Sequence, residues 1–135
     1  MINYDLSRIR LIIFDVDGVL SASTVGMDSE GMPLRTLNIK DGYAIQLAVK
    51  KGLPIAIISG GRSAAVEKRY QYLGMTEIHM GAGMKMQTYE ALLEKYGVTD
   101  ADVLYMGDDI PDLQVMQRVG CACCPKDAAP EVRAV

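Results

Sequence analysis

Residues 10–20 read Arg10-Leu11-Ile12-Ile13-Phe14-Asp15-Val16-Asp17-Gly18-Val19-Leu20. The apolar run at the start of this stretch predicts a strand that is buried on both faces, as in a parallel sheet. Two acids separated by one residue follow the run directly, and a glycine comes next. Open α/β sheets bind their ligands at the carboxyl ends of the strands. Asp15 and Asp17 are therefore candidates for a ligand site, and an ordinary Asp-Gly turn is the alternative.

This pair of acids suits phosphoryl transfer. One carboxylate can attack phosphorus while the other moves protons to and from the departing oxygen. A divalent metal would hold the first acid and the phosphate together in spite of their shared negative charge.

Composition restricts the classes of protein to which the chain can belong. Its 135 residues suffice for one buried core, so we expect a single domain over residues 1–135. A net charge of −3 argues against nucleic-acid and anionic-membrane partners. No apolar run approaches the roughly 18 residues of a membrane span, and the first residues lack the pattern of a secretory signal. The expected location is the cytoplasm.

The cysteines and the single histidine give weaker signals. Cys121, Cys123 and Cys124 crowd into four residues, and their odd number argues against a disulfide framework. A zinc site would need further Cys or His ligands, and His79 stands alone. We interpret the cysteines as part of a small-residue buried strand rather than a metal or redox site, and His79 as structural rather than a base.

Alternating strand and helix patterns predict parallel βαβ units. The expected fold is α/β, a three-layer Rossmann-like sandwich with a parallel sheet. We expect a small β-hairpin flap at about residues 24–38, with a turn at 28–31, which is far too small to be a lid domain. An ordinary excursion between strand and helix is the alternative. Asp41 is a candidate N-cap for the helix that follows the flap. The remaining elements are strands over 54–58, 77–80, 103–106 and 120–124, and helices over 41–51, about 63–73, 84–96 and 113–119.

Two further segments carry candidate phosphate ligands. Ser59-Gly60-Gly61-Arg62-Ser63 joins a strand to a helix, where its hydroxyl and free amides could hold a phosphate, although a simple capping turn is equally compatible. Lys85 lies in the first turn of a helix, against the unfavourable end of the helix dipole. This position indicates an anionic partner, and a solvated lysine is the alternative.

A second acidic cluster, Gly107-Asp108-Asp109-Ile110-Pro111-Asp112, follows the strand over 103–106. Acids at the start of a helix are common by themselves. Two acid-rich strand ends in one small sheet are better explained by a hard-cation site, with the oxygen ligands that Mg²⁺ prefers.

The order of these motifs resembles the haloacid dehalogenase superfamily of phosphatases. The motifs are Asp15-Val16-Asp17-Gly18-Val19, Ser59-Gly60, Lys85 and Gly107 to Asp112. The small hairpin and Asn38-Ile39-Lys40-Asp41-Gly42-Tyr43 resemble its cap-less branch, which includes the 3-deoxy-D-manno-octulosonate (KDO) 8-phosphate phosphatases that release KDO for lipopolysaccharide.

The resemblance implies a role for each matched residue. Asp15 would be the nucleophile that forms an aspartyl-phosphate, and Asp17 the general acid and then base. Ser59 and Lys85 would bind the transferring phosphoryl group. Mg²⁺ would be held by Asp15, the backbone carbonyl of Asp17, and Asp108. The remaining implied positions are Asp109 and Asp112 as loop supports, and Asn38, Ile39, Lys40, Asp41, Gly42, Gly60, Gly61, Arg62 and Arg69 as substrate contacts.

The resemblance also implies a homotetramer with sites at the subunit interfaces, acting on a 2-keto-3-deoxy sugar-acid phosphate. Two departures from the pattern bear on the substrate. Gly61 stands where relatives often carry arginine, with Arg62 one place later. We also expect the further helix and glycine-rich tail of the family to be absent after Val135.

Three alternatives to KDO 8-phosphate hydrolysis remain open. The first is a phosphatase for a related nine-carbon sugar-acid phosphate. The second is a non-catalytic assembly module of sugar-nucleotide synthesis, although scaffolding needs neither the acids nor Lys85. The third is a phospho-accepting receiver domain, which is disfavoured because its acceptor Asp follows the third strand, where this chain has His79-Met80-Gly81.

Overall fold

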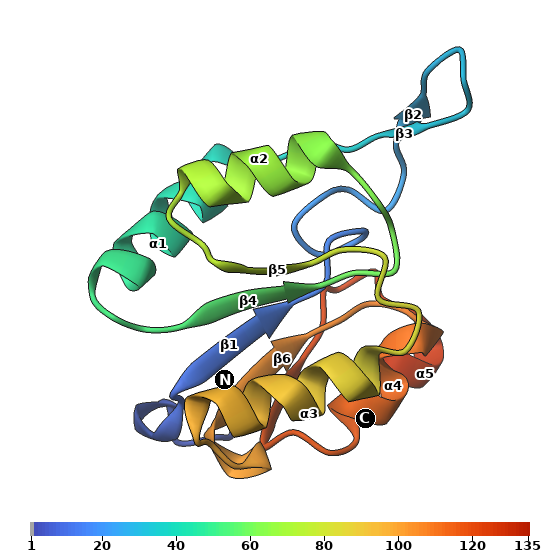
Figure 1. Ribbon diagram of the computed structural model, residues 1–135. Coiled ribbons are helices and arrows are strands. Elements are labelled where there is room, and N and C mark those ends of the chain that lie inside the picture. Colours follow the sequence, from blue (N-terminus) through green and yellow to red (C-terminus); the bar gives the residue numbers. More distant parts are fainter. Residues whose placement is uncertain (1) are drawn as a thin grey trace.

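Strand β1 (Leu11–Phe14) lies at the centre of the sheet in the computed structural model, which describes residues 2–135 (Figure 1). The five strands follow the order β5-β4-β1-β6-β7, and every neighbouring pair is parallel. The other four are β4 (Ile55–Ile58), β5 (Glu77–His79), β6 (Val103–Met106) and β7 (Cys121–Cys123). The predicted parallel sheet is confirmed, and β1 lies between β4 and β6, the position where open sheets form a ligand crevice.

Helices cover both faces of this sheet, which confirms the three-layer α/β sandwich (Figure 1). One layer contains α1 (Ile39–Lys50) and α2 (Ala64–Tyr72). The opposite layer contains α3 (Lys85–Tyr96), α4 (Leu113–Met116) and α5 (Pro130–Arg133). Short 3₁₀ turns occupy Leu6–Arg8, Asp100–Asp102 and Ile110–Asp112.

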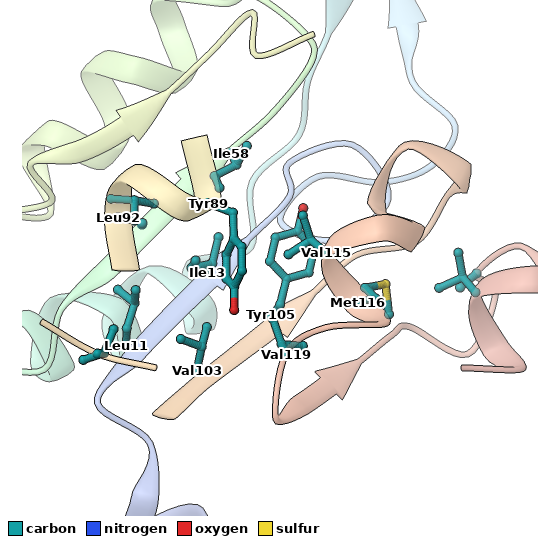
Figure 2. Packing of buried hydrophobic residues seen from close by; sticks show 14 residues of the cluster. Leu11, Ile13, Ile58, Tyr89, Leu92, Val103, Tyr105, Val115, Met116 and Val119 are labelled. Carbon is teal, nitrogen blue, oxygen red and sulfur yellow. The ribbon is translucent and has the colours of Figure 1, made fainter. Parts of the chain in front are cut away.

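The larger hydrophobic cluster fills the space between the sheet and the α3–α5 layer (Figure 2). Tyr89 from α3 and Tyr105 from β6 are fully buried at its centre, and Val115 and Met116 of α4 pack beside them. Full burial of an aliphatic or aromatic side chain contributes about 1.5–3 kcal/mol. Both tyrosines also keep a polar partner, because their hydroxyls donate to Asp100 and Asp112 respectively.

A second cluster forms under α1 and α2. It joins Val16 and Ile57 near the sheet to Ile45 of α1, Tyr70 of α2 and Leu73 at the end of α2. Because β1 contributes Leu11 and Ile13 to the first cluster and Ile12 and Phe14 to the second, both its faces are covered as predicted.

The flap is a two-stranded antiparallel hairpin of β2 (Gly26–Met27) and β3 (Pro33–Leu34). It projects from the carboxyl-end edge of the sheet (Figure 1). At its tip, Asp28 Oδ1 accepts from two backbone N–H groups, and Gly31 has a φ of +79°. The hairpin strands are shorter than the predicted runs over 25–27 and 34–37. Within residues 2–135, the insertion between β1 and α1 consists of this flap and its connections and contains no cap domain.

Local signals at the ends of helices were partly misleading. Helix α1 begins after Asn38, whose side chain accepts from the N–H groups of Lys40 and Asp41, so Asp41 is not the cap. Helix α4 begins at Leu113 as predicted, directly after a 3₁₀ turn over Ile110–Asp112, but it ends at Met116 rather than at 119. Helix α5 was not predicted.

Between residues 2 and 135, none of the helices combines the length and the apolar character that crossing a bilayer requires.

The cap assignment predicts different effects for two neighbouring substitutions. Asn38→Ala should lower the free energy of unfolding by about 1 kcal/mol, because two N–H groups of the first turn lose their acceptor. Asp41→Asn should lower it by only about 0.3 kcal/mol, since it removes a favourable charge near the helix dipole but no cap. Urea unfolding followed by circular dichroism measures both values. A larger loss for Asp41→Asn would contradict the assignment of Asn38 as the cap.

Candidate active site

The loops after β1, β4 and β6 enclose a hollow of about 290 Å³ at the carboxyl edge of the sheet. Its lining includes all four residues that were predicted to be catalytic, and Asp108. The full set is Asp15, Asp17, Gly18, Ser23, Ser59, Gly60, Gly61, Lys85, Asp108, Asp109 and Pro111. The sheet thus brings together side chains from four separate segments of the sequence.

Asp15 is fixed by its position directly after β1. The residue is 7 % exposed, its Oδ1 accepts from the N–H of Val16 at 2.7 Å, and its Oδ2 lies 3.0 Å from Lys85 Nζ. Burial raises the pKa of Asp15 above its ordinary value; the charge of Lys85 opposes this shift, and that of Asp112 adds to it. The carboxylate therefore combines a fixed orientation with one close cationic partner.

Lys85 is buried between two carboxylates. Its Nζ lies 2.7 Å from Asp112 Oδ1 as well as 3.0 Å from Asp15, and the residue is 7 % exposed. The alternative of a solvated lysine is therefore wrong, and the two acids explain why a cation is stable at the start of α3.

Asp112 is fully buried, and both of its oxygens have hydrogen-bond partners. Oδ1 accepts from Lys85 and from the hydroxyl of Tyr105 at 2.6 Å. Oδ2 accepts from the backbone N–H of Asp108 at 3.1 Å and of Asp109 at 3.4 Å. Since these bonds use its accepting capacity, Asp112 holds the loop in place and has little left to offer a metal.

Asp108 lies at the end of β6 in a strongly acidic environment. Burial raises its pKa to about 6, and the charges of Asp15 and Asp112 add to that effect. Gly18 packs against it so closely that a Cβ there would lie 1.8 Å from Asp108 Oδ2, and the φ of Gly18 is +80°. Both the space and the backbone conformation therefore require glycine at position 18.

This donor set fits a hard divalent cation. Carboxylate oxygens of Asp15, Asp108 and Asp112 lie within 4.8 Å of one another. Because Asp112 already has its hydrogen-bond partners, Asp15 and Asp108 are the carboxylates of this group that are available to a cation. The backbone carbonyl of Asp17 lies two residues after Asp15 in the same loop. Oxygen ligands of this kind suit Mg²⁺. The raised pKa of Asp108 reflects its burial first and then the negative charge of Asp15 and Asp112, which such a cation would balance.

The second loop approaches the same hollow from β4. Ser59 is 1 % exposed, and its Oγ accepts from the N–H of Gly61 at 3.3 Å. Two backbone bonds tie this loop to the one after β5: Gly81 N–H donates to Gly61 at 2.8 Å, and Ala82 N–H donates to Ser59 at 2.9 Å. The serine and the glycines therefore face the acids from a fixed backbone.

An arginine that the sequence analysis did not single out contacts Asp17. Arg35, next to β3 in the flap, donates from Nε to Asp17 Oδ1 at 2.7 Å and from Nη2 to Oδ2 at 2.9 Å. Position 35 follows no periodic pattern and belongs to no motif, so no local signal in the sequence could have identified this contact.

The predicted substrate contacts are distributed over several hollows. Gly60 and Gly61 line the acidic hollow, whereas Asn38, Ile39, Lys40 and Asp41 line a neighbouring open groove of about 740 Å³ that shares Gly18 and Ser23 with it. Arg69 borders a third hollow, and a Cβ at Gly42 would lie 2.8 Å from Arg69 Nη2. The guanidinium of Arg62 lies against Gly81.

His79 and the cysteines lie outside the acidic hollow. His79 Nε2 lies 3.0 Å from Glu77 Oε2 on β5, in agreement with a structural role. All three cysteines are free, and Cys121 is buried in β7, which agrees with the predicted strand.

Comparison with known families supplies the classification. The model of the haloacid dehalogenase-like hydrolase family matches residues 36–120. The chain belongs to the haloacid dehalogenase-like hydrolases. The resemblance drawn from the four motifs is thereby confirmed.

Similar members of this family come from several bacteria. The KDO 8-phosphate phosphatase KdsC of Escherichia coli K12 is 40% identical over 123 residues, which are 91% of this chain and 65% of that protein. The crystal structure of the Yersinia pestis KDO 8-phosphate phosphatase matches 96% of this chain and 70% of its own, with 36% identity and a TM-score of 0.90. The Moraxella catarrhalis phosphatase, in complex with magnesium, phosphate and KDO, matches 96% and 75%, with 32% identity and a TM-score of 0.89. The chain thus spans about 65% of the length of the E. coli relative.

The raised pKa of Asp108 predicts a pH-dependent stability in the metal-free protein. Its carboxyl titrates near pH 6 when folded and near pH 3.8 when unfolded, so the folded state loses stability as pH rises from about 4 to 6. Asp108→Asn removes this loss. In EDTA, the variant should exceed the wild type by about 1 kcal/mol in unfolding free energy at about pH 7.5, a value that allows for solvent screening, and should match it near pH 4.

Asp109→Asn is the matched control, because it removes the same charge from an exposed neighbour and should change stability little at either pH. Added Mg²⁺ should stabilise the wild type and not Asp108→Asn. A variant less stable than the wild type at every pH in EDTA would contradict the unfavourable charge assigned to Asp108.

Proposed function

We propose that this hydrolase is a Mg²⁺-dependent phosphatase that cleaves KDO 8-phosphate to KDO and phosphate. One observation carries the chemistry: a buried carboxylate, a second and half-exposed carboxylate, a cation and a serine followed by two glycines all face one small hollow. Phosphate ester hydrolysis has one of the highest uncatalysed barriers, which enzymes lower by positioning and charge stabilisation. The residues around this hollow provide both.

In the first proposed step, Asp15 is the nucleophile. One of its carboxylate oxygens attacks phosphorus, the bond from phosphorus to the ester oxygen breaks, and that oxygen leaves with a proton from the Asp17 carboxyl. The products are an aspartyl-phosphate at Asp15 and the free sugar alcohol. The contact of Asp15 with Lys85 at 3.0 Å keeps the nucleophile oriented throughout.

In the second step, water attacks the phosphorus of the aspartyl-phosphate. The Asp17 carboxylate accepts the proton of that water, the bond from phosphorus to Asp15 breaks, and phosphate is released. Lys85 and the N–H groups around Ser59 would bind the phosphoryl oxygens. Mg²⁺, held by Asp15, Asp108 and the backbone carbonyl of Asp17, would offset the negative charge that otherwise keeps a carboxylate away from a phosphate ester.

The choice of sugar acid rests on the relatives, since KDO 8-phosphate phosphatases of E. coli and Y. pestis are among the similar proteins. The groove that contains Asn38, Ile39, Lys40 and Asp41 adjoins the acidic hollow at Gly18 and Ser23, so a sugar could lie there while its phosphate faces Asp15. Gly42 and the loop residues Gly60 to Arg62, together with Arg69, complete the proposed contacts. The cytoplasm stays the predicted location.

The deciding experiment is phosphate release from a panel of esters, with Mg²⁺ and with EDTA. KDO 8-phosphate, its nine-carbon analogue and hexose phosphates form the panel. We expect metal-dependent turnover with preference for KDO 8-phosphate, and a loss of about 10³-fold or more for Asp15→Asn with the fold intact. Glu94→Gln makes the same acid-to-amide change at an exposed site of α3 and should retain full activity.

Each other outcome points to a different conclusion. Preference for the nine-carbon ester would replace the substrate but keep the chemistry. Full activity of Asp15→Asn would reject the nucleophile. A wild type that releases no phosphate from any ester would instead favour the non-catalytic assembly module.

We further propose that the chain assembles as a homotetramer with sites at the subunit interfaces. Exposed large apolar side chains on the flap and on α1 support this, because apolar surface of this kind often marks a contact with another protein. They follow the flap and the exposed side of α1: Met27, Met32, Leu34, Leu37, Ile39, Tyr43 and Leu47.

Sedimentation equilibrium should give about four times the chain mass of 14.7 kDa. Leu34→Asn should shift the protein toward smaller species, because it places an amide within the apolar contact. Tyr72→Asn, at the far end of α2, should leave the mass unchanged. A wild type that sediments as a monomer at all concentrations would reject the tetramer.

A further inference from the structure

Arg35 and Asp17 form a bidentate ion pair at the edge of the acidic hollow. The guanidinium fork binds one carboxylate oxygen with Nε at 2.7 Å and the other with Nη2 at 2.9 Å. Its third nitrogen, Nη1, donates to the backbone carbonyl of Arg62 at 3.3 Å. Such a pair fixes both the position and the plane of the carboxylate, because the fork is planar and rigid.

The exposure of the two side chains assigns them different roles. The Arg35 side chain is 6 % exposed, whereas the Asp17 side chain is 48 % exposed. Asp17 lines the acidic hollow and Arg35 does not; Arg35 instead borders the separate hollow beneath the flap. Arg35 therefore binds Asp17 from the side away from the acidic hollow, and the carboxylate faces the space where an ester would lie.

Gly61 provides the room for this guanidinium. A Cβ at position 61 would lie 2.3 Å from Arg35 Nη2, 3.1 Å from its Cζ and 3.3 Å from Asp17 Oδ2. Gly61 is not among the glycines with positive φ, so its backbone would accept alanine. The reason for glycine here is space, since any side chain would displace the arginine.

We propose that Arg35 is a positioning residue that aims the Asp17 carboxylate at the departing ester oxygen, and that Gly61 is glycine because this guanidinium lies over it. The inference rests on the proposed phosphatase function. Within residues 2–135, Arg35 is the one side chain that forms hydrogen bonds with the Asp17 carboxylate. Each carboxylate oxygen accepts one bond from Arg35 and keeps further accepting capacity for the proton that it transfers. Displacement by about 1 Å at a reacting group can cost about 100-fold in rate.

A series of leaving groups tests this role. When the ester bond breaks, an alkoxide leaving group must gain a proton. A phenolate depends less on protonation, and 4-nitrophenolate is a stable leaving group without it. A misplaced proton donor therefore penalises the three esters unequally. For Arg35→Met, kcat/KM should fall about 100-fold with KDO 8-phosphate, less with phenyl phosphate, and by no more than about 3-fold with 4-nitrophenyl phosphate.

Gly61→Ala tests the same idea without touching the arginine. Its methyl group should displace the guanidinium and produce the same graded losses, and the double variant should be no worse than Arg35→Met alone. Arg118→Met is the matched control, because it also removes an arginine with two carboxylate partners, Glu90 and Asp100, at a distance from the hollow. It should leave all three kcat/KM values unchanged.

The outcomes separate this inference from the function on which it rests. Equal losses with all three esters would show a merely structural role and overturn the inference while the phosphatase stands. Full activity of Gly61→Ala would also overturn it, even if Arg35→Met fails to fold. A wild type that hydrolyses none of the esters would reject the proposed function and the positioning role with it.

Discussion

The buried carboxylate of Asp112 is the interaction on which the rest of the site depends. It binds the ammonium of Lys85 at the start of α3, the hydroxyl of Tyr105 in β6 and the backbone N–H groups of the loop after β6. Three elements are thereby fixed around one side chain that has no exposure to solvent. Removing any partner would leave a buried charge or donor without compensation, which costs far more than the same loss at the surface. Lys85 in turn lies 3.0 Å from Asp15 Oδ2, so the buried carboxylate of Asp112 also helps to fix the position of the proposed nucleophile.

Much of this arrangement could be predicted because it follows from the ends of strands. Buried apolar runs predicted the sheet, and the parallel direction implied that residues after different strands would meet at one edge. This reasoning alone predicted that one site would contain Asp15, Asp17, Ser59 and Asp108. Lys85 was identified because a cation at a helix N-terminus contradicts the dipole and needs an anion nearby.

The remaining features depend on contacts that no local pattern encodes. Asn38 and Asp41 are both good capping residues within one turn, and the choice between them depends on where α1 packs against the sheet. The pairing of Arg35 with Asp17 depends on the path of an irregular flap. The glycine at position 61 looked like a departure from a motif, yet a guanidinium from 26 positions earlier occupies the space above it.

The central position of β1 in the sheet has a consequence for folding during synthesis. This first strand pairs with β4 on one side and with β6, which begins at Val103, on the other. During synthesis from the N-terminus, Asp15 leaves the ribosome well before β6, Tyr105 and Asp112, because about 90 residues separate β1 from β6. Until then the edge of β1 that faces β6 is an unpaired template, and contacts between such distant segments form slowly. Nascent chains of this topology therefore expose an aggregation-prone edge between the synthesis of β1 and that of β6, and the acidic hollow cannot form before Asp108 and Asp112 have been made.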